Sequence, residues 1–321
     1  MLIEVPAEIG GARRGRPSRT TASVLGLTAV VSVVYDRILF PTDGSEAADE
    51  VLDHVLDLAV GVEATLYVLN VADTNRDSVA TIDGQVVDVL VDEGEGIVDA
   101  AADRARERGV HVETEVVQGD PYRTIVDYAD TRDVGLIAMP ARGRRGLDRF
   151  LLGSVTERVI RQSDVPVLTI RPDDDVDLRT PYRNVLVPTD GSESANAALA
   201  AGIGVASASD AALHLLHVVE ETGFGLGFGA DDEAVEAEGN ETLETAAQTA
   251  KEGSIESITT AIERGSAHEE ILAYVEDHDV DLVVVGTHGR TNLDRYLLGS
   301  VAEKLVRSSP VPVMTVRESK T

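Results

Sequence analysis

The stretch that determines the fold is Arg142-Gly-Arg-Arg-Gly-Leu-Asp-Arg-Phe-Leu-Leu-Gly-Ser-Val155, because it returns later in the chain as His288-Gly-Arg-Thr-Asn-Leu-Asp-Arg-Tyr-Leu-Leu-Gly-Ser-Val301. A second motif does the same, since Pro41-Thr-Asp-Gly-Ser-Glu46 returns as Pro188-Thr-Asp-Gly-Ser-Glu193. The chain of 321 residues therefore consists of two copies of one domain. Each copy is long enough to bury a core of its own.

The composition is strongly acidic. Against 57 acidic residues there are 28 basic ones, a formal net charge of −29, which argues against binding to nucleic acid or to an anionic membrane. The only lysines are Lys251, Lys304 and Lys320. Abundant acid with almost no lysine suggests a halophilic, cytoplasmic protein that stays soluble in concentrated salt, where a short Debye length screens self-repulsion. The absence of cysteine excludes disulfides, and we expect no metal site because the histidines form no zinc-like cluster.

Residues 1–34 differ from the rest. Four arginines precede an apolar run, Val24 to Val34, that is too short to span a bilayer. A signal peptide, a disordered arm and translated upstream sequence all remain open, although no small-residue cleavage site precedes Tyr35. We expect the folded part to begin near residue 35.

Within each copy, short apolar runs alternate with longer helical stretches, which is typical of a parallel sheet with crossover helices on both faces. The helix expected at Glu46 to Val60 has its apolar residues on one face and N-cap residues in Asp43-Gly-Ser45. The expected strands of the first copy are Arg37 to Pro41, Ala64 to Val71, Val110 to Val117, Val134 to Met139 and Val165 to Ile170. Those of the second are Asn184 to Pro188, Ala212 to Val219, Ile255 to Ile262, Val280 to Val285 and Val311 to Val316.

The predicted fold class is α/β, with two tandem doubly wound domains, each a five-stranded parallel sheet of order 3-2-1-4-5. We expect domains at 35–171 and 182–318, joined by an acidic, proline-flanked linker at 172–181. The last strand of each copy contains a proline, so we expect both to be outer strands, since proline is tolerated at a sheet edge. In this order, the switch point lies between the first and fourth strands, and ligands bind at their carboxyl ends.

The two repeated motifs follow these two strands. In the second copy, Gly286-Thr-His-Gly289 comes after the fourth strand, and Gly299-Ser300-Val301 begins the next helix. Glycine lets a backbone approach phosphate oxygens, and a helix N-terminus offers unpaired N–H groups. Taken singly, these glycines are turn or cap residues, Asp190 is an N-cap and His217 is a satisfied, half-buried histidine. Only their joint placement indicates a site.

The pattern Gly-x2-Gly-x9-Gly-Ser, together with Pro-Thr-Asp-Gly-Ser, resembles the ATP-binding branch of the universal stress protein family. The resemblance covers residues 35–318 as a tandem pair. It implies that Asp190 and the backbone near Val218 contact adenine and ribose, and that the glycines and Ser300 surround ribose and phosphates. The implied binding residues of the second copy are Pro188, Thr189, Asp190, Val218, Gly286, His288, Gly289, Gly299, Ser300 and Val301.

The first copy departs from the pattern because Pro140 stands where the second has Gly286. Proline lacks an N–H group and excludes a positive φ, so we expect an altered first site. Arg142, Arg144 and Arg145 either compensate by pairing with phosphate or are solvated surface residues. The corresponding binding residues are Pro41, Thr42, Asp43, Val71, Gly143, Gly153, Ser154 and Val155.

The resemblance implies a stress-response sensor or regulator that binds ATP, alone or with Mg²⁺, and acts on an unknown protein partner. It also implies that the two copies pair as an intrachain pseudo-dimer, and it leaves a homo-oligomer open. The glycine-rich stretch Gly223 to Gly229 is either a lid or a linker. No catalytic residue is expected, because no Walker lysine, carboxylate pair or general base accompanies the glycines. Slow ATP hydrolysis and a nucleotide-free interaction scaffold are the alternatives.

Overall fold

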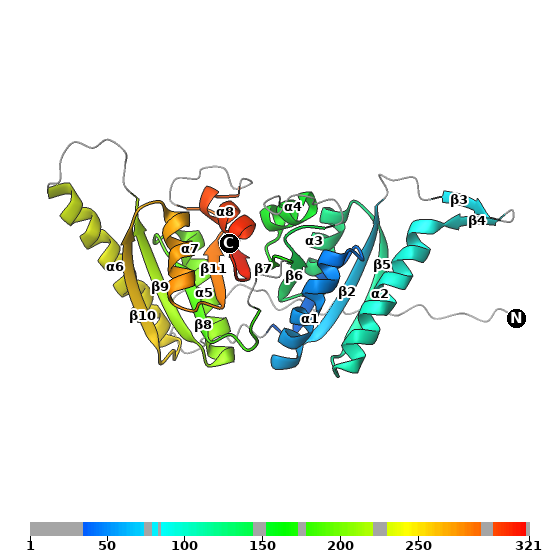
Figure 1. The fold of residues 1–321 in the computed structure, drawn as a ribbon, viewed down its shortest axis with the longest axis horizontal. Coiled ribbons are helices and arrows are strands. Elements are labelled where there is room, and N and C mark those ends of the chain that lie inside the picture. Colours follow the sequence, from blue (N-terminus) through cyan, green and yellow to red (C-terminus); the bar gives the residue numbers. More distant parts are fainter. Residues whose placement is uncertain are drawn as a thin grey trace, which may run out of the picture. The chain divides into compact units, whose positions relative to one another are not determined.

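The structure is a computed structural model that describes residues 35–73, 79–82, 85–143, 152–172, 178–220, 230–289 and 298–318. The N-terminal extension at 1–34 and the glycine-rich stretch at 223–229 lie outside the described residues, as does the middle of the proposed linker. Figure 1 shows the strands and helices of both repeats.

The first repeat forms a parallel sheet with helices between its strands. In sheet order the strands are β5 (Val112–Gly119), β2 (Thr65–Asp73), β1 (Arg37–Pro41), β6 (Leu136–Pro140) and β7 (Val167–Ile170). The helices are α1 (Glu46–Gly61), α2 (Val89–Glu107), α3 (Pro121–Thr131) and α4 (Ser154–Gln162). This arrangement is the predicted α/β fold with strand order 3-2-1-4-5.

The second repeat has the same order. Its strands are β10 (Ile258–Arg264), β9 (Ala212–Val219), β8 (Asn184–Pro188), β11 (Leu282–Gly286) and β12 (Val313–Val316). Its helices are α5 (Glu193–Ser209), α6 (Ala230–Glu252), α7 (Ala267–Asp277) and α8 (Ser300–Ser308). The predicted doubly wound fold is confirmed in both repeats.

Several strands begin later than the apolar pattern predicts, and the helix ends explain why. Asp133 after α3 has a φ of 51°, and the next N–H, of Val134, donates to Ala129 O at 2.9 Å. The same arrangement precedes β5, where Val110 N–H donates to Ala105 O at 2.9 Å. These apolar residues close the C-terminus of the preceding helix. They are buried, but they belong to the helix end and not to the strand.

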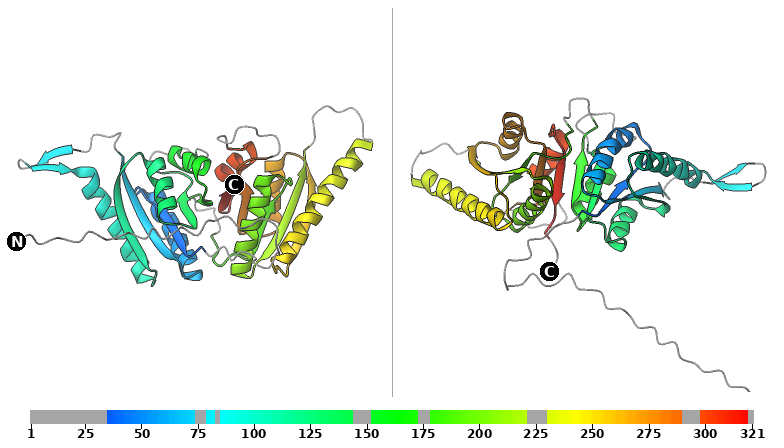
Figure 2. Two further views of the ribbon diagram at one scale, coloured as in Figure 1. Left: turned by 180° about the vertical axis from the view of Figure 1, so that it is seen from behind. Right: turned by 90° about the horizontal axis from the view of Figure 1, so that it is seen from below.

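One feature was not predicted. Strands β3 (Val79–Ile82) and β4 (Gln85–Asp88) form a two-stranded antiparallel hairpin before α2 (Figures 1 and 2). The two residues between them in the sequence are Asp83 and Gly84. An Asp-Gly pair between apolar runs is a strong hairpin signal, so the sequence contained the information.

Helices cover both faces of the sheets, which explains why the central strands β1, β6, β8 and β11 are almost entirely apolar and buried. The outer strands β5 and β10 carry exposed polar residues. One buried cluster includes residues of α1, α2, α5 and α6. The other includes residues of α3, α4, α7 and α8. A parallel sheet needs this double cover because its strands are apolar on both sides. In the central strands β1, β6, β8 and β11, polar residues are therefore confined to the strand ends.

The last strands of the two repeats pair with each other. β7 and β12 are antiparallel, with Val313 opposite Thr169 and Thr315 opposite Val167, so the described strands of both repeats form one ten-stranded sheet. The Thr169 hydroxyl donates to Val313 O at 3.0 Å, and the Thr315 hydroxyl donates to Val167 O at 3.2 Å. Each of these strands is the outer strand of its own repeat, as predicted, and the two repeats pair through them.

The prolines used for that prediction do not interrupt the pairing. Pro166 and Pro312 come just before β7 and β12, and only their carbonyls are used, accepting from Ile137 N–H at 3.0 Å and Val283 N–H at 3.1 Å. A proline before the first residue of a strand loses no hydrogen bond of the ladder.

A buried polar cluster also connects the repeats. The ring nitrogens of His54 in α1 lie 3.0 Å from the Tyr182 hydroxyl and 3.2 Å from the Thr180 hydroxyl. His54 and Tyr182 are both 4% exposed. A neutral imidazole can donate to one hydroxyl and accept from the other. Burial lowers the pKa of His54 to about 4.

This shift predicts a loss of stability in mild acid. Since the pKa of His54 is lower in the folded than in the unfolded chain, the unfolded chain takes up the proton first as the pH falls. The stabilisation is complete above about pH 6.5 and is lost down to about pH 4, a change of roughly 3 kcal/mol. Urea unfolding of His54→Gln should depend less on pH across this window than that of the parent. The exposed His111→Gln is the control, and equal pH dependence for His54→Gln and the parent would contradict the prediction.

Candidate functional site

A tight turn follows the first strand of each repeat. Gly44 and Gly191 have φ values of 67° and 78°, a conformation that favours glycine. The preceding threonine hydroxyls accept from the glycine N–H groups at 3.1 Å for Thr42 and 3.2 Å for Thr189. We call residues 42–45 and 189–192 the Thr-Asp turns. Their glycines are required by the backbone, whatever the ligand.

The aspartates of these turns are not the helix N-caps. The N-caps are Ser45 and Ser192, whose side chains accept from the N–H groups of Ala48 and Ala195. Asp43 Oδ1 accepts from Ser45 N–H at 3.1 Å, and Asp190 Oδ1 accepts from Ser192 N–H at 3.0 Å. One carboxylate oxygen of each aspartate is thus used to hold the turn.

The other carboxylate oxygen lies beside the glycine after the fourth strand. A Cβ atom added to Gly143 would lie 2.8 Å from Asp43 Oδ2, and one added to Gly289 would lie 3.1 Å from Asp190 Oδ2. The structure therefore brings the two repeated motifs together at the switch point of each repeat, where an α/β sheet binds ligands.

The third glycine of the pattern begins a helix. Gly153 N–H donates to Ala141 O at 2.8 Å, and Gly299 N–H donates to Thr287 O at 2.7 Å. Each is the N-cap of the following helix, α4 or α8, and makes no side-chain cap hydrogen bond. In α4 the first N–H that donates within the helix is that of Glu157, to Gly153 O at 2.9 Å. The N–H groups before it are available to an anion.

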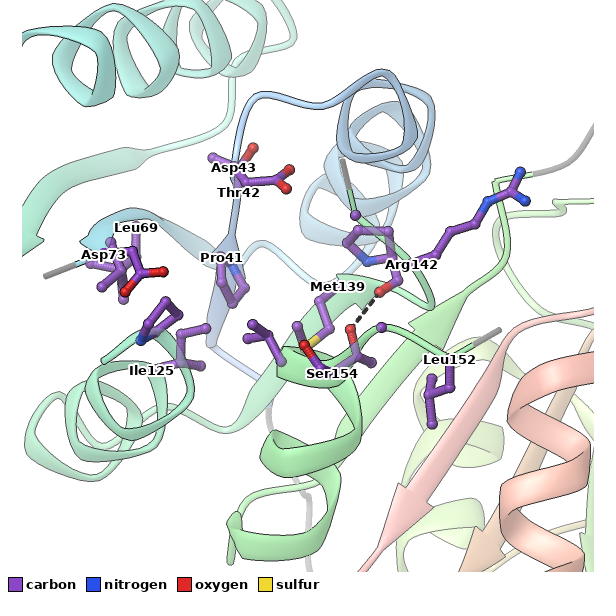
Figure 3. A pocket seen from close by; sticks show the side chains of 17 residues that line it. Pro41, Thr42, Asp43, Leu69, Asp73, Ile125, Met139, Arg142, Leu152 and Ser154 are labelled. Atoms are coloured by element: carbon purple, nitrogen blue, oxygen red, sulfur yellow. Dashed lines mark hydrogen bonds between the residues drawn. The ribbon is translucent and has the colours of Figure 1, made fainter. Parts of the chain in front are cut away.

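In the first repeat these elements surround a cavity of about 380 Å³ (Figure 3). It is lined by every residue predicted for the first site: Pro41, Thr42, Asp43, Val71, Gly143, Gly153, Ser154 and Val155. Pro140 and Arg142 line it too. Further lining residues were not predicted, namely Leu69, Asp73, Pro121, Ile125, Met139, Leu152 and Thr156. These residues belong to or adjoin β2, α3, β6 and α4. Only their position at the carboxyl end of the sheet could have indicated from the sequence that they line the site.

The arginines of the first repeat were predicted to bind phosphate or to be solvated. Arg142 Nη2 donates to Pro172 O at 2.9 Å, and its guanidinium points away from the other side chains that line the cavity (Figure 3). Arg144 and Arg145 lie outside the described residues. A pairing of these arginines with phosphate stays a prediction.

The second repeat places its predicted residues on the same elements. Pro188 ends β8, Val218 lies in β9, Gly286 ends β11, and Ser300 and Val301 begin α8. His288 N–H donates to the Ser194 hydroxyl at 3.2 Å, and His288 Nδ1 lies 2.9 Å from the Thr287 hydroxyl. His217 is 9% exposed, with Nδ1 2.8 Å from Thr189 O. It is therefore the satisfied histidine expected from the sequence.

Of the two reasons predicted for an altered first site, the loss of a positive φ does not apply, because Gly286 is not among the residues with positive φ. The loss of an N–H donor at Pro140 stays a prediction. The structure adds a steric difference between Pro140 and Gly286. A Cβ atom at Gly286 would lie 2.4 to 2.8 Å from Ser194 atoms, two of them backbone. Gly286 thus permits a close approach of α5 to β11. In the first repeat Pro140 carries a Cβ atom, so α1 and β6 cannot approach each other equally closely.

Comparison with known proteins agrees with this architecture. The model of the universal stress protein family matches residues 34–171 and again 181–317. The chain belongs to the universal stress protein family. Universal stress protein MJ0531 of Methanocaldococcus jannaschii is 34% identical over 141 residues, which are 43% of this chain and 83% of that protein.

Two solved structures of the family are similar to this chain. That of a universal stress protein from Archaeoglobus fulgidus covers 89% of this chain and 99% of its own, with 27% identity and a TM-score of 0.68. A universal stress protein solved in complex with cAMP covers 44% of this chain and 99% of its own, with 27% identity and a TM-score of 0.36. The first comparison extends the likeness over both repeats.

The described residues include neither a membrane-spanning helix nor a metal-binding cluster. No helix among them is long and apolar enough to cross a membrane. They also contain no group of three histidine, aspartate or glutamate side chains arranged to hold a metal ion.

The close approach at Gly286 predicts a stability defect. Gly286→Ala should lower the free energy of unfolding by about 1 to 3 kcal/mol, because the new methyl group would overlap Ser194. Gly96→Ala in α2 is the control, since nothing lies within 4 Å of its added Cβ atom and alanine favours a helix. Urea unfolding measures both. Equal stability of Gly286→Ala and the parent would contradict the account of the close approach.

Proposed function

We propose that this universal stress protein binds adenine nucleotide, with ATP as its preferred ligand, and that nucleotide occupancy regulates a protein partner during stress. The observation that carries the proposal is the cavity of the first repeat, where every residue predicted for that site lines one space of about 380 Å³. This volume is within the range of small-molecule sites, about 300 to 1,000 Å³. The proposed domains are residues 35–171 and 182–318.

The site elements suit a phosphate group in an acidic protein. With a net charge of −29, bulk electrostatics repel a polyphosphate. Backbone N–H groups at the start of α4 and α8 attract it locally, because they are unpaired within the helix and lie at its positive end. Mg²⁺ carried by the nucleotide would reduce the repulsion further.

The apolar part of the cavity suits a base. Leu69, Val71, Ile125 and Met139 supply apolar surface next to the Thr-Asp turn. By the family resemblance, Asp43 and Asp190 contact adenine and ribose in the two repeats. We propose that the second repeat, with the full glycine pattern, is the regular site, and that Pro140 alters the first.

Nucleotide bound to the purified protein tests this proposal. The full chain is purified in concentrated KCl and denatured, and released nucleotide is identified by mass spectrometry. Gly289→Val with Gly299→Val should remove the nucleotide of the second repeat, and Gly143→Val with Gly153→Val should remove that of the first, because added side chains block a backbone-dependent site. Circular dichroism must show that each pair of substitutions leaves the fold intact.

The stoichiometry distinguishes the alternatives. One ATP per chain, lost with the second-repeat substitutions, supports a regular site there and a disabled first site. Two per chain would mean that Pro140 does not disable the first site. No nucleotide, even after ATP is added back, would reject the function and favour an interaction scaffold. Phosphate release that depends on Gly299 would favour slow hydrolysis.

The acidic composition supports a second part of the proposal, namely that the protein works in concentrated salt. Raising KCl from about 0.1 M to about 1 M shortens the Debye length from about 10 Å to about 3 Å and should raise the melting temperature by weakening self-repulsion. Differential scanning fluorimetry across this range measures the effect, with choline chloride at equal ionic strength as the control. A melting temperature that falls with both salts would contradict it.

A further inference from the structure

We propose that Asn70 and His217 are positioning residues that hold the Thr-Asp turns in their ligand-binding geometry, and that they are interchangeable between the repeats. Neither residue belongs to the family pattern quoted above, and Asn70 is not among the residues that line the cavity of the first repeat. The inference rests on the proposed nucleotide binding and adds to it the residues that keep the site in shape.

The two residues contact equivalent backbone carbonyls, one in each repeat. Asn70 Nδ2 donates to Thr42 O at 2.8 Å, and His217 Nδ1 lies 2.8 Å from Thr189 O. A carbonyl oxygen only accepts, so the His217 imidazole carries a proton on Nδ1. The amide and the imidazole thus perform one task at equivalent positions of β2 and β9.

The neighbouring backbone completes the restraint. Thr42 N–H donates to Leu69 O at 2.9 Å, and Thr189 N–H donates to Leu216 O at 2.8 Å. Each turn is therefore tied to the second strand by two hydrogen bonds, one from the main chain and one from the next side chain. The residue after each threonine is the aspartate whose Oδ2 faces Gly143 or Gly289. A displaced threonine carbonyl would move that carboxylate within the site.

Each polar side chain fits against a glycine in a helix. A Cβ atom on Gly94 of α2 would lie 2.6 Å from Asn70 Oδ1, and one on Gly239 of α6 would lie 2.8 Å from His217 Cδ2. Glycine inside a helix is destabilising by about 1 kcal/mol relative to alanine, yet both repeats have one at this contact. The contact leaves Asn70 and His217, which are 6% and 9% exposed, little freedom to turn away from the carbonyl.

The residue found in one repeat can be used as the conservative substitution in the other. His217→Asn puts the residue of the first repeat into the second, and Asn70→His does the reverse. His217→Leu fills the space without a donor and leaves Thr189 O without its side-chain partner. ATP binding to the second repeat is measured by calorimetry in the full chain with Gly143→Val and Gly153→Val, so that only this repeat reports. His217→Leu should weaken binding roughly tenfold or more, whereas His217→Asn should stay within about threefold of the parent.

A matched pair of glycines tests the first repeat. Gly94→Ala should push Asn70 off the carbonyl and weaken binding in a chain with Gly289→Val and Gly299→Val. Gly96→Ala, two positions along the same helix, has nothing within 4 Å of its added Cβ atom and should leave binding unchanged. These two glycine variants still test the positioning role if His217→Leu fails to fold.

The outcomes separate the two proposals. If the parent binds no nucleotide, the proposed function fails and the positioning role falls with it. If the parent binds and His217→Leu binds equally well, only the positioning role is overturned. The positioning role is also overturned if His217→Asn binds ATP as weakly as His217→Leu. If Asn70 and His217 share one role, asparagine at position 217 must restore the binding that leucine loses. Nitrogen NMR of the ligand-free protein should show His217 protonated on Nδ1, and a proton on Nε2 alone would contradict the geometry.

Discussion

A parallel sheet must be covered on both faces, and much of this molecule follows from that constraint. Its central strands are apolar on both sides, so in each repeat the first two helices bury one cluster and the last two helices bury another. Little space remains on the faces of the central strands for polar chemistry. The ends of the strands are the remaining place, and the change of direction between the first and fourth strands opens the carboxyl end to a ligand. The location of the site is thus a consequence of the fold, before any ligand is considered.

The strand order and the meeting of the two repeated motifs could be predicted, because the signals for both occur twice in the sequence. Apolar runs predicted the strands, and the repeated glycines predicted which loops meet. The predicted first residues of the strands were less accurate. A buried valine such as Val134 can close the preceding helix with its N–H group while its side chain is buried like that of a strand residue. The sequence does not distinguish these two uses of a buried residue. The hairpin of β3 and β4 had a signal in Asp83-Gly84 but no counterpart in the second repeat to draw attention to it.

The reason for a particular glycine was harder to predict than its presence. Gly44 has a positive φ, Gly94 gives room to a side chain, and Gly286 gives room to the backbone of a helix. These are three different physical requirements behind one residue type. Only the second and third depend on residues distant in the sequence, and for that reason the sequence could not reveal the partners Asn70 and Ser194. The same limit applies to His217, whose burial was predicted but whose partner, Thr189 O, was not.

The two repeats keep side-chain contacts at equivalent positions but use different residue types to make them. In the first, the Tyr67 and Tyr128 rings lie 6.4 Å apart, and Arg132 at the end of α3 lies 5.2 Å from the Tyr128 ring centre. At the same places the second repeat has His214, Tyr274 and His278, with the last two rings stacked at 3.8 Å. Burial and the nearby His278 lower the pKa of His214. Arg132 in one repeat is thus replaced by His278 in the other, just as Asn70 is replaced by His217. Since each replacement keeps its contact, the fold tolerates it, and the two repeats share one architecture with different side chains.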